Sequence, residues 1–264
     1  MTAHPKVTLV TCKSMPNLFK GEEGLLDELA ARGCDPQIKV WNDPDVDWSE
    51  AGMVVVRSVS DYASDRPAFL EWTKQLRRVQ NSADVLNWNT DKHYLKELAA
   101  LGMPTIPTNW LEPEQNLSKH QIHTRFPAFG EFVVKPAVSS GVRDIGRYTT
   151  VDTRQRQAAM RQVQGLLGEG RSVMIQRYVE EIDLHGEISL VFFNGLVSHA
   201  VEKRSALHPA SVSDPAVHEA VVTAEAADSV AWKWGEEIRR VLHGYVRSRL
   251  GHDEQFLFNR VDLV

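Results

Sequence analysis

The chain has 264 residues, of which 42% are apolar and 25% are charged, and its formal net charge is −5 at pH 7. These values are typical of a globular protein with a sizeable core and two or three compact subdomains. The negative charge excludes a general attraction to nucleic acid or to acidic membranes. The two cysteines, Cys12 and Cys34, lack metal-ligand spacing and indicate buried or half-buried thiols in a reducing compartment.

The amino-terminal residues enter a strand pattern directly, KVTLVTC at 6–12, with no signal-type apolar region before it. No later window is apolar enough to span a bilayer. We therefore expect a cytoplasmic protein whose partners include neither nucleic acid nor a membrane.

The first part of the chain alternates strand and helix patterns, which predicts a small parallel sheet with helices on its faces. The strand patterns lie at 6–12, 36–42 and 52–58, and the amphipathic helix patterns at 21–33 and 66–80. In such sheets ligands bind at the carboxyl ends of the strands. Arg57, Ser58 and Asp61 lie at one such end, where a guanidinium would suit a carboxylate ligand. A capped turn is the alternative interpretation of these three residues.

The middle of the chain begins with a helix pattern at 91–102, for which Asn89 or Thr90 would be the N-cap and Gly102 the stop. After an extended PTIPT segment come the strand FVVKP at 132–136, a small-residue turn and a returning strand at 144–151. A surface helix at 153–170 and a strand at 172–181 follow.

The last part of the chain predicts a β-hairpin at 186–204, with Asn194-Gly195 as its tight turn. Residues 205–228 are rich in small residues and predict a long loop, with a short helix at 218–228. A helix pattern at 234–251 and a strand at 255–264 complete the chain. The fold class is thus α/β, and we expect three domains, at 1–86, 87–176 and 177–264.

The strand FVVKP raises the question of what a charged amine does at the end of an apolar run. A lone strand lysine usually lies at a sheet edge with its amine in water. However, the turn at 138–141 offers backbone N–H groups without bulky side chains, as a phosphate cradle requires. Lys92 opens the preceding helix and Glu187 begins a later strand. Asp262 lies between apolar residues, and a carboxylate buried there would need a partner or a metal.

These segments together resemble the ATP-grasp superfamily over nearly the whole chain. The stretches that carry the resemblance are NWNTDKHYLKELAALGMPTIPT, FVVKP, SSG, MIQRYVE, GEISLVFFNG and RVDLV. Their spacing is similar to that of prokaryotic glutathione synthetase and of the D-alanine–D-alanine ligases. RSVSDY, WNTDKHYL and SHAVEKR resemble more closely a branch that includes the O-ureido-serine cyclo-ligase of cycloserine biosynthesis.

The resemblance implies a parallel-sheet pre-ATP-grasp domain followed by two α+β subdomains that enclose the nucleotide. It implies ATP and Mg²⁺ as cofactors, a small carboxylate and an amine-type nucleophile as substrates, an acylphosphate intermediate, and it allows a homodimer. The nucleotide ligands that it implies are Lys92, Lys135, Ser139, Ser140, Gly141, Gln176, Arg177, Tyr178, Val179 and Glu187. Catalytic roles fall to Lys203 and Arg260, the metal to Asp262, and substrate binding to Arg57, Ser58 and Asp61.

Two departures from the family pattern accompany the resemblance. The chain ends at Val264, directly after the strand with Asp262, whereas the family pattern continues with a strand that carries a glutamate and often an asparagine of the magnesium site. We therefore expect a truncated chain; on the alternative that this is its natural length, we expect weak or absent ligase activity. Residues 205–228 contain no arginine or lysine where the family has a glycine-rich loop with an arginine, and Ser60 replaces a bulky aromatic residue.

Three functions remain open at this point. The favoured one is an ATP-dependent ligase that joins a small carboxylate to an amine-type nucleophile, within one molecule or between two. The second is a nucleotide-binding relative that has lost catalysis and acts as a binding or regulatory module. The third is an α/β protein that binds no nucleotide, in which Lys92 is a solvent-facing helix lysine and Glu187 an ordinary charged strand end.

Overall fold

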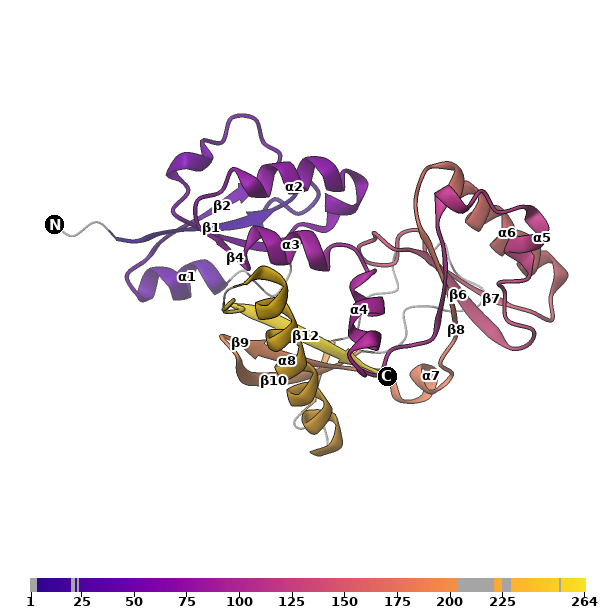
Figure 1. The fold of residues 1–264 in the computed structure, drawn as a ribbon. Helices are drawn as coiled ribbons and strands as arrows, with labels where there is room; N and C mark the ends of the chain where they lie inside the picture. The colour runs from indigo at the N-terminus through magenta and orange to yellow at the C-terminus, as the bar shows by residue number, and fades with distance from the viewer. Residues whose placement is uncertain (1–3, 20–21, 23, 204–220, 225–228, 252) are drawn as a thin grey trace. The chain divides into compact units, whose positions relative to one another are not determined.

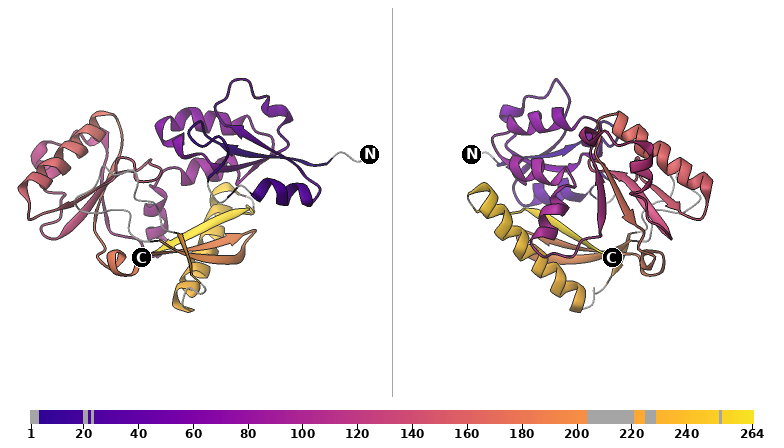
Figure 2. Two further views of the ribbon diagram at one scale, coloured as in Figure 1. Left: turned by 180° about the vertical axis from the view of Figure 1, so that it is seen from behind. Right: turned by 45° about the vertical axis from the view of Figure 1, so that its right-hand side comes forward.

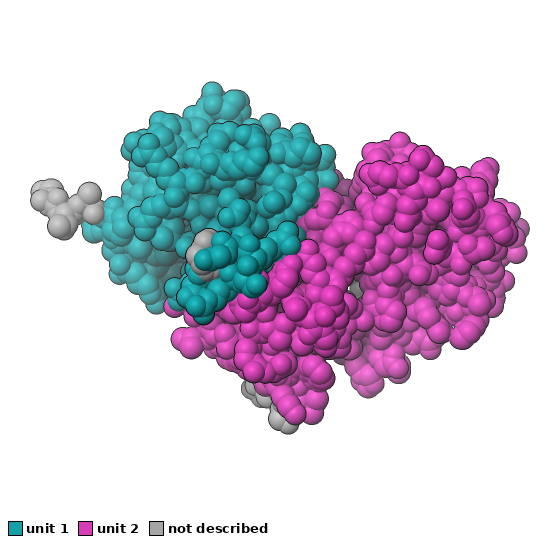
Figure 3. Space-filling view, viewed as in Figure 1, with its two compact units in different colours: residues 1–90, 246–257 teal, residues 91–245, 258–264 magenta. Residues whose placement is uncertain are grey.

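The computed structural model describes residues 4–19, 22, 24–203, 221–224, 229–251 and 253–264. These residues form two compact units, shown in different colours in Figure 3. Unit 1 contains residues 1–90 and 246–257, and unit 2 contains residues 91–245 and 258–264. Within the described residues, no helix combines the length and the apolar composition that a bilayer crossing needs.

Unit 1 is built on a parallel sheet with the strand order β2-β1-β3-β4. Its strands are β1 (Lys6–Thr11), β2 (Asp35–Val40), β3 (Met53–Ser58) and β4 (Val79–Gln80). Its helices are α1 (Gly24–Ala31), α2 (Arg66–Lys74) and α3 (Ala83–Asn89), with short 3₁₀ turns at Trp48–Glu50 and Ser60–Ser64. Helices α1 and α2 lie on opposite sides of the sheet (Figure 1). The parallel sheet predicted for the start of the chain is therefore confirmed.

An aromatic cluster fills the core between α2 and the sheet. Trp41, Phe69 and Trp72 are buried, and their rings contact one another with centroids 5.5–6.0 Å apart. Helix α2 begins where the Asp65 carboxylate accepts a hydrogen bond from the N–H of Ala68. The helix is shorter than the predicted 66–80, because it ends at Lys74 and the chain then enters β4.

Helix α3 was not predicted from the sequence, and it corrects the expected start of the next helix. The Ser82 hydroxyl caps α3, and Thr90 closes it by donating to the Leu86 carbonyl over 2.7 Å. Asn89 and Thr90 thus end one helix and do not cap the next, which starts only at Tyr94.

Unit 2 contains two antiparallel sheets. The first has the order β5-β8-β6-β7, and its strands are β5 (Thr108–Leu111), β6 (Glu131–Pro136), β7 (Gly146–Thr149) and β8 (Val173–Arg177). Helices α5 (Lys119–His123) and α6 (Thr153–Gly168) cover one face of it (Figures 1 and 2). Phe132, Val134 and Val163 belong to the core between these helices and the sheet.

The second sheet of unit 2 has the order β11-β10-β9-β12. Its strands are β9 (Glu187–Phe193), β10 (Leu196–Lys203), β11 (Val221–Ala224) and β12 (Phe258–Leu263). Helix α8 (Ser229–Leu250) packs on this sheet, with Ala231 against the buried Leu190 and Phe192. The predicted hairpin is confirmed, since β9 and β10 pair around Asn194 and Gly195, whose φ angles are 52° and 77°. Unit 2 also contains α4 (Tyr94–Ala100), a 3₁₀ turn at Pro113–Gln115 and α7 (Glu181–His185).

The short helix expected at 218–228 is wrong for its described part. Residues Val221–Ala224 form β11, which pairs antiparallel with β10. The sequence VVT is rich in β-branched residues, and an available neighbouring strand favours extension over a helix. The rest of the predicted loop, 205–220 and 225–228, lies outside the described residues. The three-domain division at 86 and 176 remains a proposal.

Candidate functional site

Lys92 is fastened to the small-residue loop that follows β6. Its ammonium donates to the Oγ and the carbonyl oxygen of Ser139, over 2.6 and 3.1 Å, and more weakly to the carbonyl of Ala137 at 3.4 Å. The N–H of Lys92 also donates to the Ala137 carbonyl over 3.0 Å. Two segments that are remote in sequence, the start of the α4 region and the loop after β6, are thereby held together.

Lys135 lies at the end of β6 and shares its surroundings with Lys92. Burial first, and the positive charge of Lys135 second, lower the pKa of Lys92 from 10.5 to about 8, against an opposing effect of Asp91. Burial also lowers the pKa of Lys135, and the Glu187 carboxylate partly offsets this. The ammonium of Lys135 makes no hydrogen bond to another described residue, whereas its backbone belongs to the β6–β8 pairing. Two neighbouring cations that burial destabilises would both gain from a polyanionic ligand.

The loop itself offers donors to such a ligand. Ser139 is buried, at 7% exposure, and Gly141 adopts the left-handed φ of 61°. Neither the N–H of Ser140 nor that of Gly141 donates a hydrogen bond within the described part of the chain. Successive backbone N–H groups beside two lysines form the kind of concave donor set that binds phosphates.

The segment after β8 supplies one further N–H for which the described part of the chain has no acceptor. Gln176 lies inside β8, between β5 and β6, and its side chain donates to Thr108 over 2.7 Å. Arg177 places its guanidinium over the ring of Phe129. The N–H of Tyr178 is already used, since it donates to the Glu131 carbonyl over 2.9 Å. The N–H of Val179, by contrast, finds no acceptor among the described residues.

The second sheet contributes Glu187, the first residue of β9, which acts electrostatically on Lys135. Its partner across the hairpin is Lys203, the last residue of β10. The side chain of Lys203 lies outside the described part of the structure, so the role predicted for it stays a prediction.

Asp262 is not buried, and that expectation is wrong. β12 is an edge strand with alternating exposure, so Asn259 and Val261 face the core, and Arg260 and Asp262 face outward. Asp262 accepts a hydrogen bond from Ser189 over 2.7 Å and pairs with Arg260, whose Nε lies 2.7 Å from its Oδ1.

Tyr94, the first residue of α4, connects this pair to the lysine cluster. Burial raises the pKa of Tyr94, the Asp262 carboxylate raises it further, and the Arg260 guanidinium opposes both effects. Tyr94 follows Lys92 by two residues, so one short segment faces both groups. One cluster is thus formed by Lys92, Lys135, Ser139 and Glu187. Arg260 and Asp262 lie near it, on the side of Tyr94 in α4.

The described residues contain no group of three acidic, histidine or cysteine side chains that could hold a metal ion by themselves. Asp262 is a single carboxylate whose oxygens already meet a hydroxyl and a guanidinium. A magnesium ion fits here only if it arrives with phosphate oxygens and water as its remaining ligands, which is how Mg²⁺ is commonly bound beside nucleotides.

The other predicted site residues lie in unit 1, at the carboxyl end of the parallel sheet. Arg57 donates from Nε to the Glu22 carboxylate over 3.1 Å and also from Nη2, and Ser58 Oγ donates to the other Glu22 oxygen over 2.8 Å. Asp61 accepts from the indole of Trp41 over 2.7 Å. Arg57 and Ser58 thus hold a carboxylate, but one that belongs to the chain itself.

Sequence reasoning missed the partners that orient these groups. The sequence did not indicate Glu22 as a partner of Arg57 and Ser58, because nothing in the residues beside Glu22 shows that its side chain contacts β3. The two cysteines were predicted to be buried or half-buried, and Cys12 is buried while Cys34 is half-buried. Burial would raise the pKa of Cys12, but hydrogen bonds with Ser14 and Ser60 outweigh that effect and lower it.

His93 is held by hydrogen bonds and ring stacking beside Lys92. Its ring lies 2.6 Å from Asp91 and 3.1 Å from Glu112, and it stacks on Trp110. These contacts fix the chain directly after Lys92. They are not visible in the sequence, because Glu112 is 19 residues away from His93.

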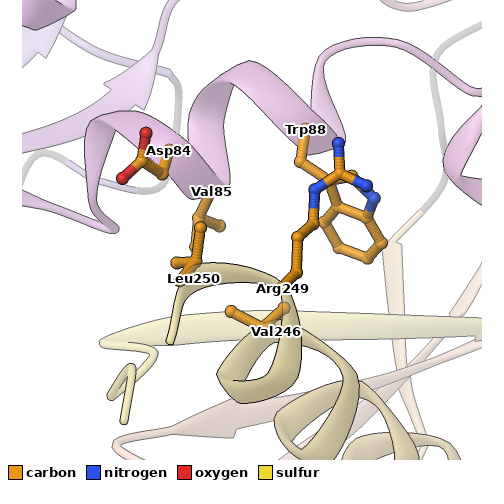
Figure 4. A pocket seen from close by; sticks show the side chains of 6 residues that line it. All are labelled: Asp84, Val85, Trp88, Val246, Arg249 and Leu250. Carbon is orange, nitrogen blue, oxygen red and sulfur yellow. The ribbon is translucent and has the colours of Figure 1, made fainter. Parts of the chain in front are cut away.

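A small recess in unit 1 lies apart from these clusters. Val85 and Trp88 of α3 face Val246 and Leu250 in the last turns of α8 (Figure 4). Its lining is mostly apolar and marks where the end of α8 packs on α3. We assign no chemistry to it.

Comparison with known proteins adds an independent line of evidence. Residues 7–87 match the family described as D-cycloserine synthetase DcsG, N-terminal domain. The chain is 33% identical over 248 residues to the cycloserine biosynthesis protein DcsG of Streptomyces lavendulae, covering 91% of this chain and 79% of that protein.

Solved structures agree with this similarity. The crystal structure of D-cycloserine synthetase DcsG matches with a TM-score of 0.80 at 31% identity, over 98% of this chain and 86% of that one. A D-alanine–D-alanine ligase from Bacillus anthracis matches with a TM-score of 0.59 at 13% identity, over 98% of this chain and 82% of that one. The second match shows a shared fold only.

Proposed function

The chain belongs to the DcsG family of ATP-grasp ligases, and we propose on this premise that it joins a small carboxylate to an amine-type nucleophile with the use of ATP. The cluster of Lys92 and Lys135 beside the loop at 139–141 carries the proposal. These residues supply two cations and two N–H donors that have no acceptor within the described residues, and together they suit a triphosphate.

In the proposed reaction, a carboxylate oxygen of the substrate attacks the γ-phosphorus of ATP, and the bond from that phosphorus to the bridging oxygen of ADP breaks. The nucleophile's nitrogen then attacks the carbonyl carbon of the acylphosphate, inorganic phosphate leaves, and the nitrogen loses its proton to water. Both steps build up negative charge on oxygen, so catalysis depends on positioned cations.

Each residue has a role in this scheme. Lys92, Lys135 and the N–H groups of Ser140 and Gly141 would hold the phosphates, with Ser139 orienting Lys92. Glu187 would accept hydrogen bonds from the ribose hydroxyls. The remaining proposed nucleotide ligands are the hinge residues Gln176, Arg177, Tyr178 and Val179. Lys203 and Arg260 would neutralise charge on the transferring phosphoryl group and on the acyl intermediate.

Asp262 is the residue proposed to hold magnesium, together with oxygens of the nucleotide. The ion would screen the charge between phosphate groups. Arg260 must then move off the Asp262 carboxylate or share it. In unit 1, we propose that Arg57, Ser58 and Asp61 bind substrate, with the substrate carboxylate replacing that of Glu22.

The structurally similar D-cycloserine synthetase DcsG is named for the synthesis of a cyclic compound. This similarity supports a substrate of the present chain that carries both the carboxylate and the nucleophile. We therefore propose ring closure within one molecule as the preferred form of the reaction. An intermolecular ligation uses the same acylphosphate and differs only in the source of the nucleophile.

A second candidate function is nucleotide binding without turnover. The observation that favours it is the Arg260–Asp262 ion pair, because it occupies a carboxylate that a magnesium ion would need. The two candidates share the lysine cluster and differ in whether phosphate is released.

The test measures thermal unfolding and phosphate release on the same full chain. Mg-ATP should raise the unfolding midpoint by linkage, beyond magnesium alone, and candidate substrates should then release phosphate. Lys135→Met should abolish both effects, and Lys119→Met, which changes an exposed lysine of α5, should leave both intact. A midpoint shift without phosphate release for any acid and amine pair would favour the second candidate. No shift at millimolar Mg-ATP would refute both.

A further inference from the structure

A buried arginine on β7 holds together the segment that follows β8. The side chain of Arg147 is only 5% exposed, and it pairs with Glu131 of β6 and Asp183 of α7. Its Nε donates to Glu131 over 3.0 Å. Its Nη1 and Nη2 donate to the two oxygens of Asp183 over 3.0 and 2.7 Å. This is a bidentate fork, a geometry that a lysine cannot reproduce.

Tyr178 is fixed by the same groups. The guanidinium carbon of Arg147 lies 3.5 Å from the centroid of the Tyr178 ring. The Tyr178 hydroxyl donates to Asp183 over 2.5 Å, and its N–H donates to the Glu131 carbonyl over 2.9 Å. Each of these three contacts of Tyr178 is made either with Arg147 or with a residue that Arg147 itself binds.

The cluster tolerates little change in its geometry. Burial alone would lower the pKa of Arg147, but the hydrogen bonds that it donates to Asp183 and Glu131 outweigh this effect and raise the pKa. A buried cation that loses one of its partners leaves an uncompensated charge. Arg147, Glu131, Asp183 and Tyr178 therefore have one strongly preferred arrangement.

The next peptide after Tyr178 is that of Val179, whose N–H has no acceptor among the described residues. Its carbonyl accepts from Ile182 and so leads directly into α7. The direction of the Val179 N–H is therefore set on one side by Tyr178 and on the other by α7, and Arg147 contacts both. We propose that Arg147 is a positioning residue that aims the Val179 N–H at the N1 acceptor of an adenine base.

This inference rests on the proposed nucleotide function and makes it specific. Adenine presents an unprotonated N1, whereas hypoxanthine carries a proton there and cannot accept from the same N–H. Arg147 would thus act on base selection. It would not act on phosphate binding, because the phosphate donors lie at 92, 135 and 140–141.

The experiment compares affinities of the full chain for Mg-ATP, Mg-ITP and inorganic tripolyphosphate, measured by calorimetry. Wild-type protein should prefer ATP over ITP by about tenfold, the effect of one hydrogen bond. Arg147→Lys keeps the charge and loses the fork, so the ratio should fall toward one while tripolyphosphate affinity stays unchanged. Tyr178→Phe keeps the ring and should reduce the ratio only in part. Arg171→Met, which changes a partly exposed ion-paired arginine, should alter nothing.

Three results would overturn the inference. The first is an ATP to ITP ratio that survives in Arg147→Lys. The second is a parallel loss of ATP and tripolyphosphate affinity in both the Arg147→Lys and Tyr178→Phe variants, as a general structural role would produce. The third is wild-type binding of tripolyphosphate without preference for ATP, which would leave the phosphate part of the proposed function intact. A wild-type protein that binds none of the three probes would instead remove the proposed function and this inference together.

Discussion

Replacing Lys92 with methionine tests the electrostatic state of the lysine cluster. Methionine keeps an unbranched stem and removes the ammonium, whose pKa burial lowers from 10.5 to about 8. The native protein must therefore hold a cation at pH 7 in a place that favours the neutral amine. Each unit by which the pKa is lowered corresponds to about 1.4 kcal/mol, so keeping Lys92 charged at pH 7 costs the native state about 3 kcal/mol.

The sign of the pH dependence follows from proton binding. Between pH 8 and 10.5 the unfolded chain keeps the Lys92 proton while the folded chain loses it, so the unfolded state binds more protons. The stability contributed by this group therefore rises with pH across that window, and the penalty is fully present below pH 8. The effect of Lys92→Met on the unfolding free energy should therefore become less favourable by about 2.5 kcal/mol between pH 7 and pH 10.

Urea unfolding of wild-type and variant protein at pH 7, 8, 9 and 10 measures this difference directly. Groups that titrate equally in both proteins cancel when the two curves are subtracted. Lys119→Met, on the exposed surface of α5, serves as the control and should show a difference that does not change with pH. A Lys92→Met difference that is equally independent of pH would refute the reasoning that burial destabilises this cation.

Three further predictions concern other parts of the chain. Gly52→Ala should lower the unfolding free energy by more than about 2 kcal/mol, because Gly52 has a φ of 69° and a Cβ there would lie 2.3 Å from the Lys6 carbonyl oxygen; an unchanged melting temperature would contradict this. Glu112→Gln should destabilise the protein at pH 7 but not near pH 2. Burial alone would raise the pKa of Glu112, yet its hydrogen bonds lower the pKa from 4.5 to about 2. The stabilising effect of Glu112 is therefore present above pH 4.5 and is lost as the pH falls toward 2. Unfolding free energies of wild type and variant that differ by the same amount at pH 7 and near pH 2 would contradict this prediction. Glu22→Gln should lower KM for the acid substrate, because it weakens the internal carboxylate that Arg57 holds; a KM that rises would show that Glu22 supports the site instead.

The features that could be predicted from sequence depend on residues close together along the chain. The Asn194-Gly195 turn needs two adjacent residues with positive φ, and both residues have it. The parallel sheet follows from β-branched runs separated by helical periods. The small residues after FVVKP identified the loop that Lys92 contacts, because steric freedom at a turn is a local property.

The errors occurred where a neighbour far along the chain decides the outcome. Residues Val221–Ala224 form a strand because β10 offers them a partner. Asp262 is exposed because the pleat of β12 points it to the face opposite the buried Val261, which belongs to the core beneath α8. The residues next to Val221–Ala224 and next to Asp262 in the sequence do not specify these partners.

By itself, the sequence determined the family and the α/β architecture, because periodicity, turn chemistry and motif spacing act over a few residues. The segments that it indicates for a nucleotide site stay a proposal. Only the tertiary structure decided which charges meet. Arg147 pairs with Asp183, which is 36 residues away in the sequence, and Arg57 pairs with Glu22, which is 35 residues away. Ion pairs need close approach of specific atoms, and that approach is set by the packing of whole elements, whose positions no local pattern specifies.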